Sequence, residues 1–587
     1  MEQNVLQNKT NNKASAGQPD LVAAKWMCRH PFVSAAAVCL CCTVLTTAEV
    51  FGVFKFYLPG ILLFLCAQVG TDYMTTKIPK LSVRAYTLAA GFASFLFSIA
   101  FSFAVSVAEN PQMIIMQSAI IACVLIALYL IMMGLMTAKK ASLLLMVSGF
   151  FVRLAYVMSI TIQTKQHDAG SVEKMKGHIG YVAYLLYNGT LPQMDVRTVD
   201  QFYHPPLHHI IAALWVKLQT LLGIDSELAF ENIQILTLFY SCACMIIAYK
   251  LFRRSGLRGA GLVCAMAVVS FCPTFYILAG SINNDILCIT FMLASLLCAL
   301  IWLDKRTFGW IMCTAVCVGC AMMSKLSGWM VAPAIAVIFV YGLVKDFTSD
   351  EDHSKTIKKY ALQFGAFLPV SAALGLWWGI RNLIRDGVSI AFIIRMSDKS
   401  DMYVGNVPLL KRLFSLDPAQ FEEVATGFER YGVSYNEYNP MLGLIKTSAF
   451  DELFTVNFFP SVEGYDRLLF WCTIVVAAIG FVSMVYCLIA DKSMRTIHKS
   501  FYGALYSVII ISYYGFCISY PHICTMNIRY AVPLIVVGAY FVGRAVMISS
   551  RAKEKFALPG RIISNIIMAA TGLYSVSSVL FYMNVFK

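Results

Sequence analysis

A polar stretch from Gln163 to Leu222 carries the densest group of side chains in this sequence that could do acid–base chemistry. Nearly all of the chain before residue 384 that lies outside this stretch is apolar and has the pattern of helices. Unpaired backbone groups in lipid cost several kcal/mol each, so a long polar segment in such a chain must lie outside the hydrocarbon. The stretch therefore predicts an active-site loop at the membrane surface. Its titratable side chains include His167, Asp168, His178, Asp195, Asp200, His204, His208 and His209.

Composition places the chain among polytopic membrane proteins. It has 587 residues, of which 59% are hydrophobic and 13% charged, with a mean hydropathy of +0.70. Soluble domains carry about 25% charged residues. The net charge of +14 fits Lys and Arg in cytoplasmic loops beside anionic lipid. No basic run interleaved with aromatic residues is present in a soluble domain, so nucleic acid is not an expected partner.

Apolar runs of about 20 residues predict an all-α protein with about 14 to 15 transmembrane helices. The 19 cysteines lie mostly inside these runs with no paired loop spacing, which favours reduced packing residues over disulfides or a zinc site. The predicted spans are Phe32–Phe54, Phe56–Tyr73, Ala85–Ala108, Gln112–Met136, Ala141–Ile162, Ala229–Leu251, Ala260–Ala279, Ile286–Leu303, Phe308–Met323, Trp329–Val344, Ala361–Ile380, Leu468–Ala490, Phe501–Tyr520, Tyr530–Ile548 and Ile562–Met583.

Two amphipathic segments in the polar stretch are predicted to lie on the membrane without crossing it. Pro206–Leu222 has its apolar residues on one helical face, but at about 1.5 Å per residue it is too short to cross a core of about 30 Å. We interpret it as an interfacial helix. Val172–Tyr187 has a similar pattern, and Asn188-Gly189 is a typical helix stop. The first large outer loop, 163–228, is thus predicted to contain juxtamembrane helices.

The distribution of cations predicts the orientation of the chain. If Pro206–Leu222 does not span, clusters such as Arg253-Arg254 and Lys355–Lys359 all fall on one side, which the positive-inside rule makes cytoplasmic. The protein is then expected in the plasma membrane as a multi-pass protein, with the polar stretch on the extracytoplasmic side. Three isolated cations near helix ends share that side: Lys325, Arg381 and Arg529.

These outer residues are suited to group transfer from a lipid phosphate. Asp168, beside His167 and just past a predicted span, is a carboxylate that could act as a general base at membrane level. Arg and Lys side chains recognise phosphate, and Arg can do so with two hydrogen bonds. A base beside a cationic phosphate site at the bilayer surface suits a reaction that moves the head group of a lipid phosphate to an acceptor.

Several short motifs on this side resemble one family. The chain is similar to the C-type (GT-C) integral-membrane glycosyltransferases, specifically the protein O-mannosyltransferase and lipid A aminoarabinose transferase group. The resemblance covers Ala141 to Met583, and the first four spans are extra. The matching residues are His167-Asp168 after a span, F-Y-H-P-P-L at Phe202–Leu207, S-I-N-N-D at Ser281–Asp285, S-K-L-S-G at Ser324–Gly328, W-x-x-R-N at Trp378–Asn382 and R-Y-x-x-P at Arg529–Pro533.

The resemblance implies a GT-C helix bundle and an inverting glycosyltransferase. Its donor would be a polyprenyl-phosphate-linked sugar, and its acceptor a protein, lipid or cell-envelope glycan outside the cytoplasm. It implies catalytic roles for Asp168, His167 and Glu173, although the family's first loop commonly carries an Asp-Glu pair and here Ala169 follows Asp168. The family sometimes uses a divalent metal ion, for which Asp168 is the candidate ligand. The implied substrate-binding residues are His204, Asn284, Asp285, Lys325, Arg381, Arg529 and Tyr530.

Structural roles compete with these functional ones. Asp168 could cap the helix after it, and Asn283, Asn284 or Asp285 could cap the next span. Arg529 and Lys325 could extend to the membrane interface for solvation alone. His204 could serve only to orient the Pro-Pro turn, and we favour this structural role.

Two other classes of protein compete with the enzyme. A transporter or flippase of a lipid-linked glycan would show intramembrane charges or broken helices at matching places in two halves. A non-catalytic assembly factor would not need acids and cations gathered on one face.

The predicted organisation has five parts. Residues 1–30 form a disordered cytoplasmic N-terminus. Residues 31–140 hold four extra N-terminal spans. Residues 141–383 form the catalytic core with its outer loop, 384–467 an extracytoplasmic loop or lid, and 468–587 the C-terminal spans.

Overall fold

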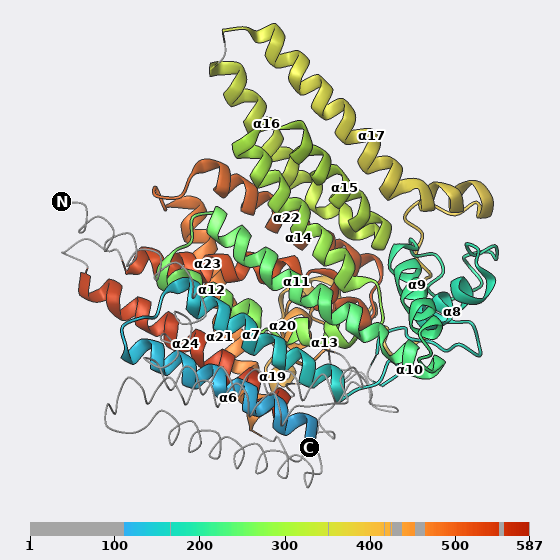
Figure 1. Ribbon diagram of the computed structural model, residues 1–587, viewed down its shortest axis with the longest axis horizontal. Coiled ribbons are helices and arrows are strands. Elements are labelled where there is room, and N and C mark those ends of the chain that lie inside the picture. Colours follow the sequence, from blue (N-terminus) through green and yellow to red (C-terminus); the bar gives the residue numbers. More distant parts are fainter. Residues whose placement is uncertain are drawn as a thin grey trace, which may run out of the picture. The chain divides into compact units, whose positions relative to one another are not determined.

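The computed structural model describes residues 111–164, 166–349, 351–415, 417–422, 424, 437–451, 464–550 and 557–585. The predicted N-terminal segment 1–30, the first three predicted spans and parts of the predicted lid lie outside these residues. Across the described residues the named elements are all helices, so the all-α class is confirmed (Figure 1).

Nine helices or joined helices among the described residues are long and apolar enough to cross a membrane, or ten if a bent pair counts as one span. Every predicted apolar run within the described residues has a counterpart, which confirms a polytopic membrane protein. The nine are α6 (Pro111–Met132), α7 (Ala138–Met158), α10 with α11 (Ser226–Glu231 and Ile233–Arg254), α14 (Asp285–Lys305), η1 with α16 (Leu326–Val331 and Ala332–Ser349), α17 (His353–Asp386), α21 (Tyr465–Ile489), α22 (Thr496–Ser519) and α24 (Ala557–Asn584).

The chain divides into two compact units, residues 1–151 and 152–587. In the first unit, α6 packs Ile126 and Leu130 against Tyr129, Met136 and Leu144. All of the residues proposed above for chemistry belong to the second unit, which is described alone from here on.

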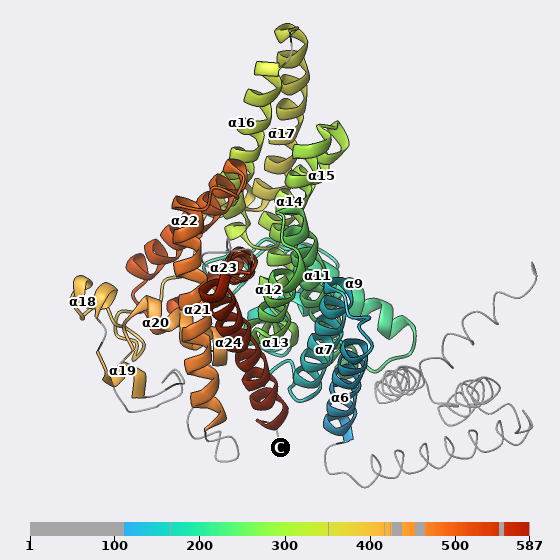
Figure 2. The same ribbon diagram turned by 90° about the vertical axis from the view of Figure 1, so that its left-hand side faces the viewer.

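The second unit is a bundle in which sequence-distant helices pack together. Helix α14 packs on α11 and on α15 (Phe308–Ser324), and α15 packs on α17. Helix α12 (Gly259–Phe271) packs on α23 (Pro533–Ser549) and α24, and α21 packs on α23 and α24. Helices α16 and α17 run together as a pair that extends beyond α14 (Figures 1 and 2).

The polar stretch folds into two short helices, α8 (Gly177–Asn188) and α9 (Leu207–Leu221), that pack on each other. Buried Ile179 and Val182 of α8 share a core with Ala212 and Val216 of α9. Helix α9 is not among the candidate spans of the described residues, which agrees with the prediction for Pro206–Leu222.

The start of α8 was predicted wrongly. The apolar pattern predicted helix from Val172, but residues 171–176 form a turn that an isolated bridge between Ser171 and Lys176 closes. Met175 has a left-handed backbone in this turn, with φ of 48°. The predicted stop is confirmed, because Gly189 ends α8 in the left-handed conformation.

Two predicted spans also differ in detail. The run Ala260–Ala279 is bent by 40° between α12 and α13 (Pro273–Gly280), where Pro273 has no N–H to continue the helix. The run from Tyr530 begins as 3₁₀ turns, η3 (Ile523–Met526) and η4 (Ile528–Tyr530), before α23 starts at Pro533. The remaining named helices are α18 (Leu409–Phe414), α19 (Ala419–Glu422) and α20 (Pro440–Phe450).

Candidate active site

Four charged side chains of alternating sign meet in the second unit, and we call them the charge cluster: Lys325, Asp285, Arg529 and Asp168. Lys325 Nζ forms an ion pair with Asp285 Oδ1. An Arg529 terminal nitrogen lies 3.9 Å from Asp285 Oδ2 and 3.3 Å from Asp168 Oδ2. The four residues come from four separate segments, so the structure brings together acids and cations that the sequence could only assign to one side.

The start of α14 fixes the Lys325 half of the cluster. Asn284 is the N-cap residue of α14, and Asn283 Oδ1, one residue earlier, accepts a hydrogen bond from the Asp285 backbone N–H at 3.1 Å. Asn284 Nδ2 donates to the Ser324 carbonyl at 2.6 Å, which ties the segment before Lys325 to this helix start. Asp285 itself is 2% exposed and its carboxylate faces the two cations. The Asp285 side chain therefore does not cap α14.

Backbone contacts hold Asp168 in place. Its φ is 55°, a left-handed conformation that Asp enters more readily than most residues. Its carbonyl accepts from the His178 N–H at 3.0 Å. Gly177 makes this approach possible, because a Cβ there would lie 2.6 Å from the Asp168 carbonyl oxygen. The residue before α8 is Lys176, so Asp168 does not cap that helix.

The Asp168 carboxylate is partly open to solvent and remains ionised. Its side chain is 41% exposed. Surrounding protein raises its pKa by desolvation, but Arg529 and then His167 outweigh that effect, so the pKa of Asp168 lies below its usual value. A carboxylate in this state can accept a proton or a hydrogen bond at neutral pH.

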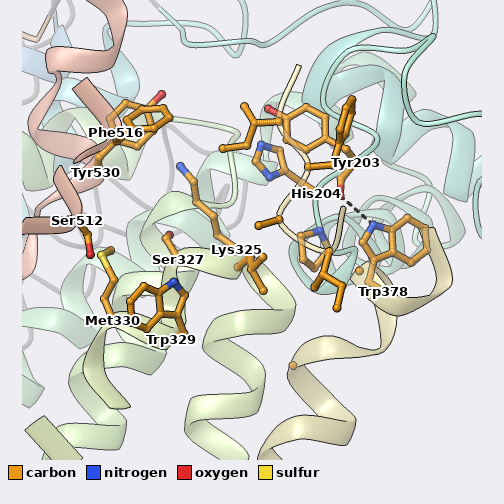
Figure 3. A pocket seen from close by; sticks show the side chains of 18 of the residues that line it. Tyr203, His204, Lys325, Ser327, Trp329, Met330, Trp378, Ser512, Phe516 and Tyr530 are labelled. Carbon is orange, nitrogen blue, oxygen red and sulfur yellow. Dashed lines mark hydrogen bonds between the residues drawn. The ribbon is translucent and has the colours of Figure 1, made fainter. Parts of the chain in front are cut away.

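A cavity of about 220 Å³ lies beside the charge cluster. Lys325 extends into the space between Phe516 and Tyr530 on one side and Tyr203 and His204 on the other (Figure 3). The cavity walls are mostly aromatic and aliphatic, and an apolar pocket with a few placed polar groups is the usual form of a ligand site. Further lining residues include Pro205, Leu326, Ser327, Trp329, Met330, Gly375, Trp378, Gly379, Ile390, Phe392, Ser512 and Tyr513.

Tyr530 links the cavity to the charge cluster. Lys325 Nζ lies 4.8 Å from the centre of its ring, and the Arg529 guanidinium carbon lies 4.9 Å from the same centre. Both distances are within the range of cation–π attraction. The ring also packs on Phe516 at 4.8 Å between centroids. Lys325 thus lines the apolar cavity, and Arg529 lies against the Tyr530 ring that forms part of its wall.

His204 is half-buried and stacks on a group of buried histidines. Its ring stacks on His178, which stacks on His209, and His178 Nδ1 lies 2.9 Å from His209 Nε2. Burial and then the positive charge of Lys325 hold the pKa of His204 well below its usual value. The imidazole that lines the cavity is therefore neutral and offers a hydrogen bond, not a charge.

Arg381 and Glu173 are among the predicted site residues that lie outside the charge cluster. Arg381 stacks on Trp378, with its guanidinium carbon 4.4 Å from the ring centre, and donates to the Pro192 carbonyl. It ties the end of α17 to the loop between α8 and α9. Glu173 is exposed in the turn before α8. Neither residue lines the cavity.

Sequence reasoning missed two residues that contact the predicted ones. His167 Nε2 lies 2.7 Å from Asp451 Oδ2, and both side chains are 6% exposed. Asn527 Nδ2 donates to Asp451 Oδ1 at 2.6 Å. Asn527 lies two residues before Arg529, on the side of the membrane predicted to be outside, and this position could have identified it as a candidate. Asp451 is one of several acids in the predicted lid, and nothing in the sequence distinguishes it.

The divalent metal ion that the family resemblance implied stays a prediction. No group of three or more His, Cys, Asp or Glu among the described residues is placed to hold a metal ion. The two carboxylates that could supply oxygen ligands, Asp168 and Asp285, already face Arg529 and Lys325. The reaction considered below is therefore derived without a metal.

The resemblance to a glycosyltransferase family is confirmed for the centre of the chain. Residues 203–377 match the family model described as dolichyl-phosphate-mannose-protein mannosyltransferase. This region includes His204, Asn284, Asp285 and Lys325, whereas Asp168 lies before it. A search of curated proteins found no match.

Two solved structures are similar in part. One is ArnT from Cupriavidus metallidurans bound to undecaprenyl phosphate, with 13% identity, a TM-score of 0.39, and 74% of this chain and 75% of that chain covered. The other is the oligosaccharyltransferase of Archaeoglobus fulgidus in the apo form, with 12% identity and a TM-score of 0.38. That comparison covers 75% of this chain and 56% of the oligosaccharyltransferase, so this chain spans a little over half of its length. We carry no residue role over from either structure.

Proposed function

We propose that this chain is a GT-C membrane glycosyltransferase that moves a sugar from a polyprenyl-phosphate-linked donor to an acceptor outside the cytoplasm. One observation carries the proposal: Lys325 lines an apolar cavity and is linked through Asp285 and Arg529 to the partly exposed Asp168. The description of the family model that matches residues 203–377 names a donor of this class, because dolichyl phosphate is a polyprenyl phosphate.

The cavity and the cations suit the two ends of such a donor. The first part of the polyprenyl tail would lie against the aromatic wall formed by Trp329, Trp378 and Phe516. The phosphate would contact Lys325 and Arg529, since charge-assisted hydrogen bonds from these donors are the strong contacts of phosphate sites. Both cations already face carboxylates, so the phosphate competes with Asp285 and Asp168 for them.

That competition prepares the base. When the donor phosphate draws on Arg529, Asp168 loses part of its ion pair and becomes a better proton acceptor. Asp168 then takes the proton of the acceptor hydroxyl while that oxygen forms a bond to the anomeric carbon. The bond from the anomeric carbon to the phosphate oxygen breaks, and the phosphate leaves with the electron pair. Lys325 and Arg529 stabilise the charge that develops on it, and a single displacement inverts the anomeric centre.

The other predicted residues support this arrangement in the proposal. His204 offers a neutral hydrogen bond to the sugar from the cavity wall, and Tyr530 holds the two cations by its ring. Asn284 sets the start of the Lys325 segment. Arg381 orders the loop before Tyr203. Glu173, exposed in the turn before α8, is kept as a predicted second acid.

We also propose that the site faces the extracytoplasmic side of the plasma membrane. The one-sided distribution of Lys and Arg supports this orientation. The acceptor hydroxyl would then belong to a protein, a lipid or an envelope glycan. A flippase of a lipid-linked glycan is the rival, and the bent pair α12–α13 is the observation that favours it, because transporters use broken helices.

Reconstitution into sealed liposomes separates the enzyme from the rival. The expected result is breakage of the sugar–phosphate bond of polyprenyl-phosphate monosaccharides, with free polyprenyl phosphate as a product. A cysteine at the exposed position Arg197, labelled by an impermeant reagent, identifies the face that carries the site, and transfer should require the acceptor on that face. Passage of intact donor across the bilayer without cleavage would contradict the enzyme and support the flippase.

A further inference from the structure

A closed ring of contacts joins three distant parts of the chain around Asp168. His167 Nε2 lies 2.7 Å from Asp451 Oδ2, and Asp451 Oδ1 accepts from Asn527 Nδ2 at 2.6 Å. Asn527 Oδ1 in turn accepts from the Arg529 N–H at 2.8 Å. Arg529 reaches Asp168 Oδ2 at 3.3 Å, and Asp168 is bonded to His167. Asp451 is thus the junction between the base loop and the segment that carries the phosphate-binding cation.

The backbone at Asp451 is strained for this residue type. Its φ is 57° and its ψ is −174°, a conformation that is essentially restricted to glycine. It follows the last residue of α20, where glycine is the common choice. Such outliers persist only where the surrounding structure enforces them, and they cluster at functional sites. An aspartate here indicates that its side chain has a use that glycine could not serve.

The surroundings show what that use is. Asp451 is 4% exposed, and each of its two carboxylate oxygens has a partner. The helix before it is fixed to the same segment, because the Ile528 N–H donates to Thr447 Oγ1 at 2.9 Å. The Tyr582 hydroxyl anchors the Ala449 carbonyl at 2.7 Å. The carboxylate is therefore held at one place relative to both His167 and Asn527.

We propose that Asp451 is a positioning residue of the transfer reaction, holding the His167–Asp168 loop and the Asn527–Arg529 segment in register so that the base meets the acceptor beside the phosphate. This inference rests on the proposed function. It assigns the residue no contact with substrate. In this inference the geometry of the reacting groups depends on the whole ring of contacts and not on Asp168 and Arg529 alone.

The two oxygens of Asp451 can be tested separately. Asp451→Asn keeps an amide oxygen for Asn527 but removes the charged acceptor from His167. It should lower kcat by about 10²-fold, the order of loss for a misplaced reacting group, and leave donor affinity close to the parent. Asn527→Ala disconnects the Arg529 segment instead and should weaken donor binding by about 10-fold. This division between kcat and affinity is not expected of a general loss of stability.

Two further variants separate positioning from folding. Asp451→Gly relieves the backbone and deletes the carboxylate. If Asp451 served only to end α20, this variant would melt at or above the parental temperature with parental kcat, and the proposal would be overturned. We expect it to lose kcat as Asp451→Asn does. The matched control is Asp491→Asn, which alters a buried carboxylate, 5% exposed, outside the site; it should lower thermal stability without changing kcat per folded molecule.

A measurement independent of activity distinguishes failure of this inference from failure of the proposed function. Hydrogen exchange followed by mass spectrometry reports the His178 and Arg529 amides, which donate within the ring or next to it. Asp451→Asn should speed exchange in the segment 166–178, and Asp451→Gly in both that segment and 526–531, while Asp491→Asn should change neither. If the parent catalyses no transfer but these exchange changes occur, Asp451 holds the two segments together as proposed, and the proposed reaction is wrong. If the parent is active and neither kcat nor exchange responds to the Asp451 variants, the inference fails alone.

Discussion

Two sets of arginine–aspartate contacts in the second unit are built in opposite ways. Arg544 directs Nε and a terminal nitrogen at one oxygen of Asp491, at 2.8 and 2.6 Å. Ser493 completes the group by donating to the other oxygen of Asp491 at 2.6 Å. The two charged side chains are 7% and 5% exposed. This pair is short and closed, and its hydrogen bonds are made within the protein.

In the charge cluster the contacts of Arg529 are longer, and one of its partners, Asp168, is partly exposed. Arg529 is shared between Asp168 at 3.3 Å and Asp285 at 3.9 Å, and Lys325 is placed against the wall of a cavity. A closed ion pair offers little to a ligand, because an anion would have to displace ideal partners. The shared and longer contacts of Arg529 leave this cation able to turn to a phosphate at low cost, whereas Lys325 keeps a close ion pair with Asp285. The difference is the one expected between a pair that stabilises the fold and a cluster with the proposed role in binding and reaction.

The largest expected effect contrasts the two aspartates. Asp168→Asn keeps the shape and should reduce transfer by about 10²–10⁴-fold, the usual worth of general-base catalysis, with abundance and melting temperature unchanged. Asp491→Asn breaks a buried pair and should cost about 3–5 kcal/mol of stability while leaving turnover per folded molecule at the parental level. Sugar release from a polyprenyl-phosphate donor and thermal melting measure the two quantities.

Near-parental turnover of Asp168→Asn would mean that Asp168, like Asp491, is not a catalytic group. The search for the base would then move to Glu173, Asp195 or Asp285. Equal loss of stability in both variants would show that the charge cluster is as structural as the Arg544 pair.

The next effect contrasts the two arginines. Arg529→Ala removes one charge-assisted contact and should weaken binding of polyprenyl phosphate by about 1.5–3 kcal/mol, roughly 10- to 150-fold. Arg544→Ala should lower the melting temperature and leave the affinity of the folded protein unchanged. Binding of a polyprenyl phosphate in detergent, compared at a temperature where both variants are folded, measures this. Parental affinity in Arg529→Ala would show that Lys325 binds the phosphate without it.

Local patterns predicted the helices well, because each depends on residues close in sequence. The apolar periodicity of Pro206–Leu222 and the stop at Gly189 are properties of single segments, and both agree with α9 and α8. The start of α8 failed because a bridge between Ser171 and Lys176 competes with the apolar pattern. The bend at Pro273 was open to prediction, since proline interrupts a helix.

The site was only partly accessible to such reasoning. Charge and topology put Asp168, Lys325 and Arg529 on one side, but their contacts depend on how four segments pack. The pairing of His167 with Asp451 crosses a long stretch of sequence, and no periodicity carries that information. The strain at Asp451 is visible only in the folded backbone. The sequence thus predicted candidate residues, and the packing of four segments decides which of them are in contact.

The smallest expected effect is a pH shift confined to the open cluster. In the free protein, desolvation raises the pKa of Asp168, but Arg529 and His167 outweigh it and the pKa lies below 3.8. A depressed carboxyl pKa contributes stability above the unfolded pKa, and that contribution is lost as pH falls through the folded pKa. Between pH 5 and 8 Asp168 therefore stays ionised and should not make stability depend on pH.

Donor binding should change this value. Once a phosphate contacts Arg529, the carboxylate loses part of the opposite charge that lowers its pKa, and the pKa of Asp168 should rise. The acid limb of kcat, which reports the complex, should then lie at higher pH than the acid limb of kcat/KM, which reports the free protein. Initial rates across pH 3 to 8 at low and saturating donor measure both limbs. Asp491→Asn should shift neither limb, because its closed pair does not respond to donor. Coincident limbs in the parent would mean that the phosphate does not compete with Asp168 for Arg529.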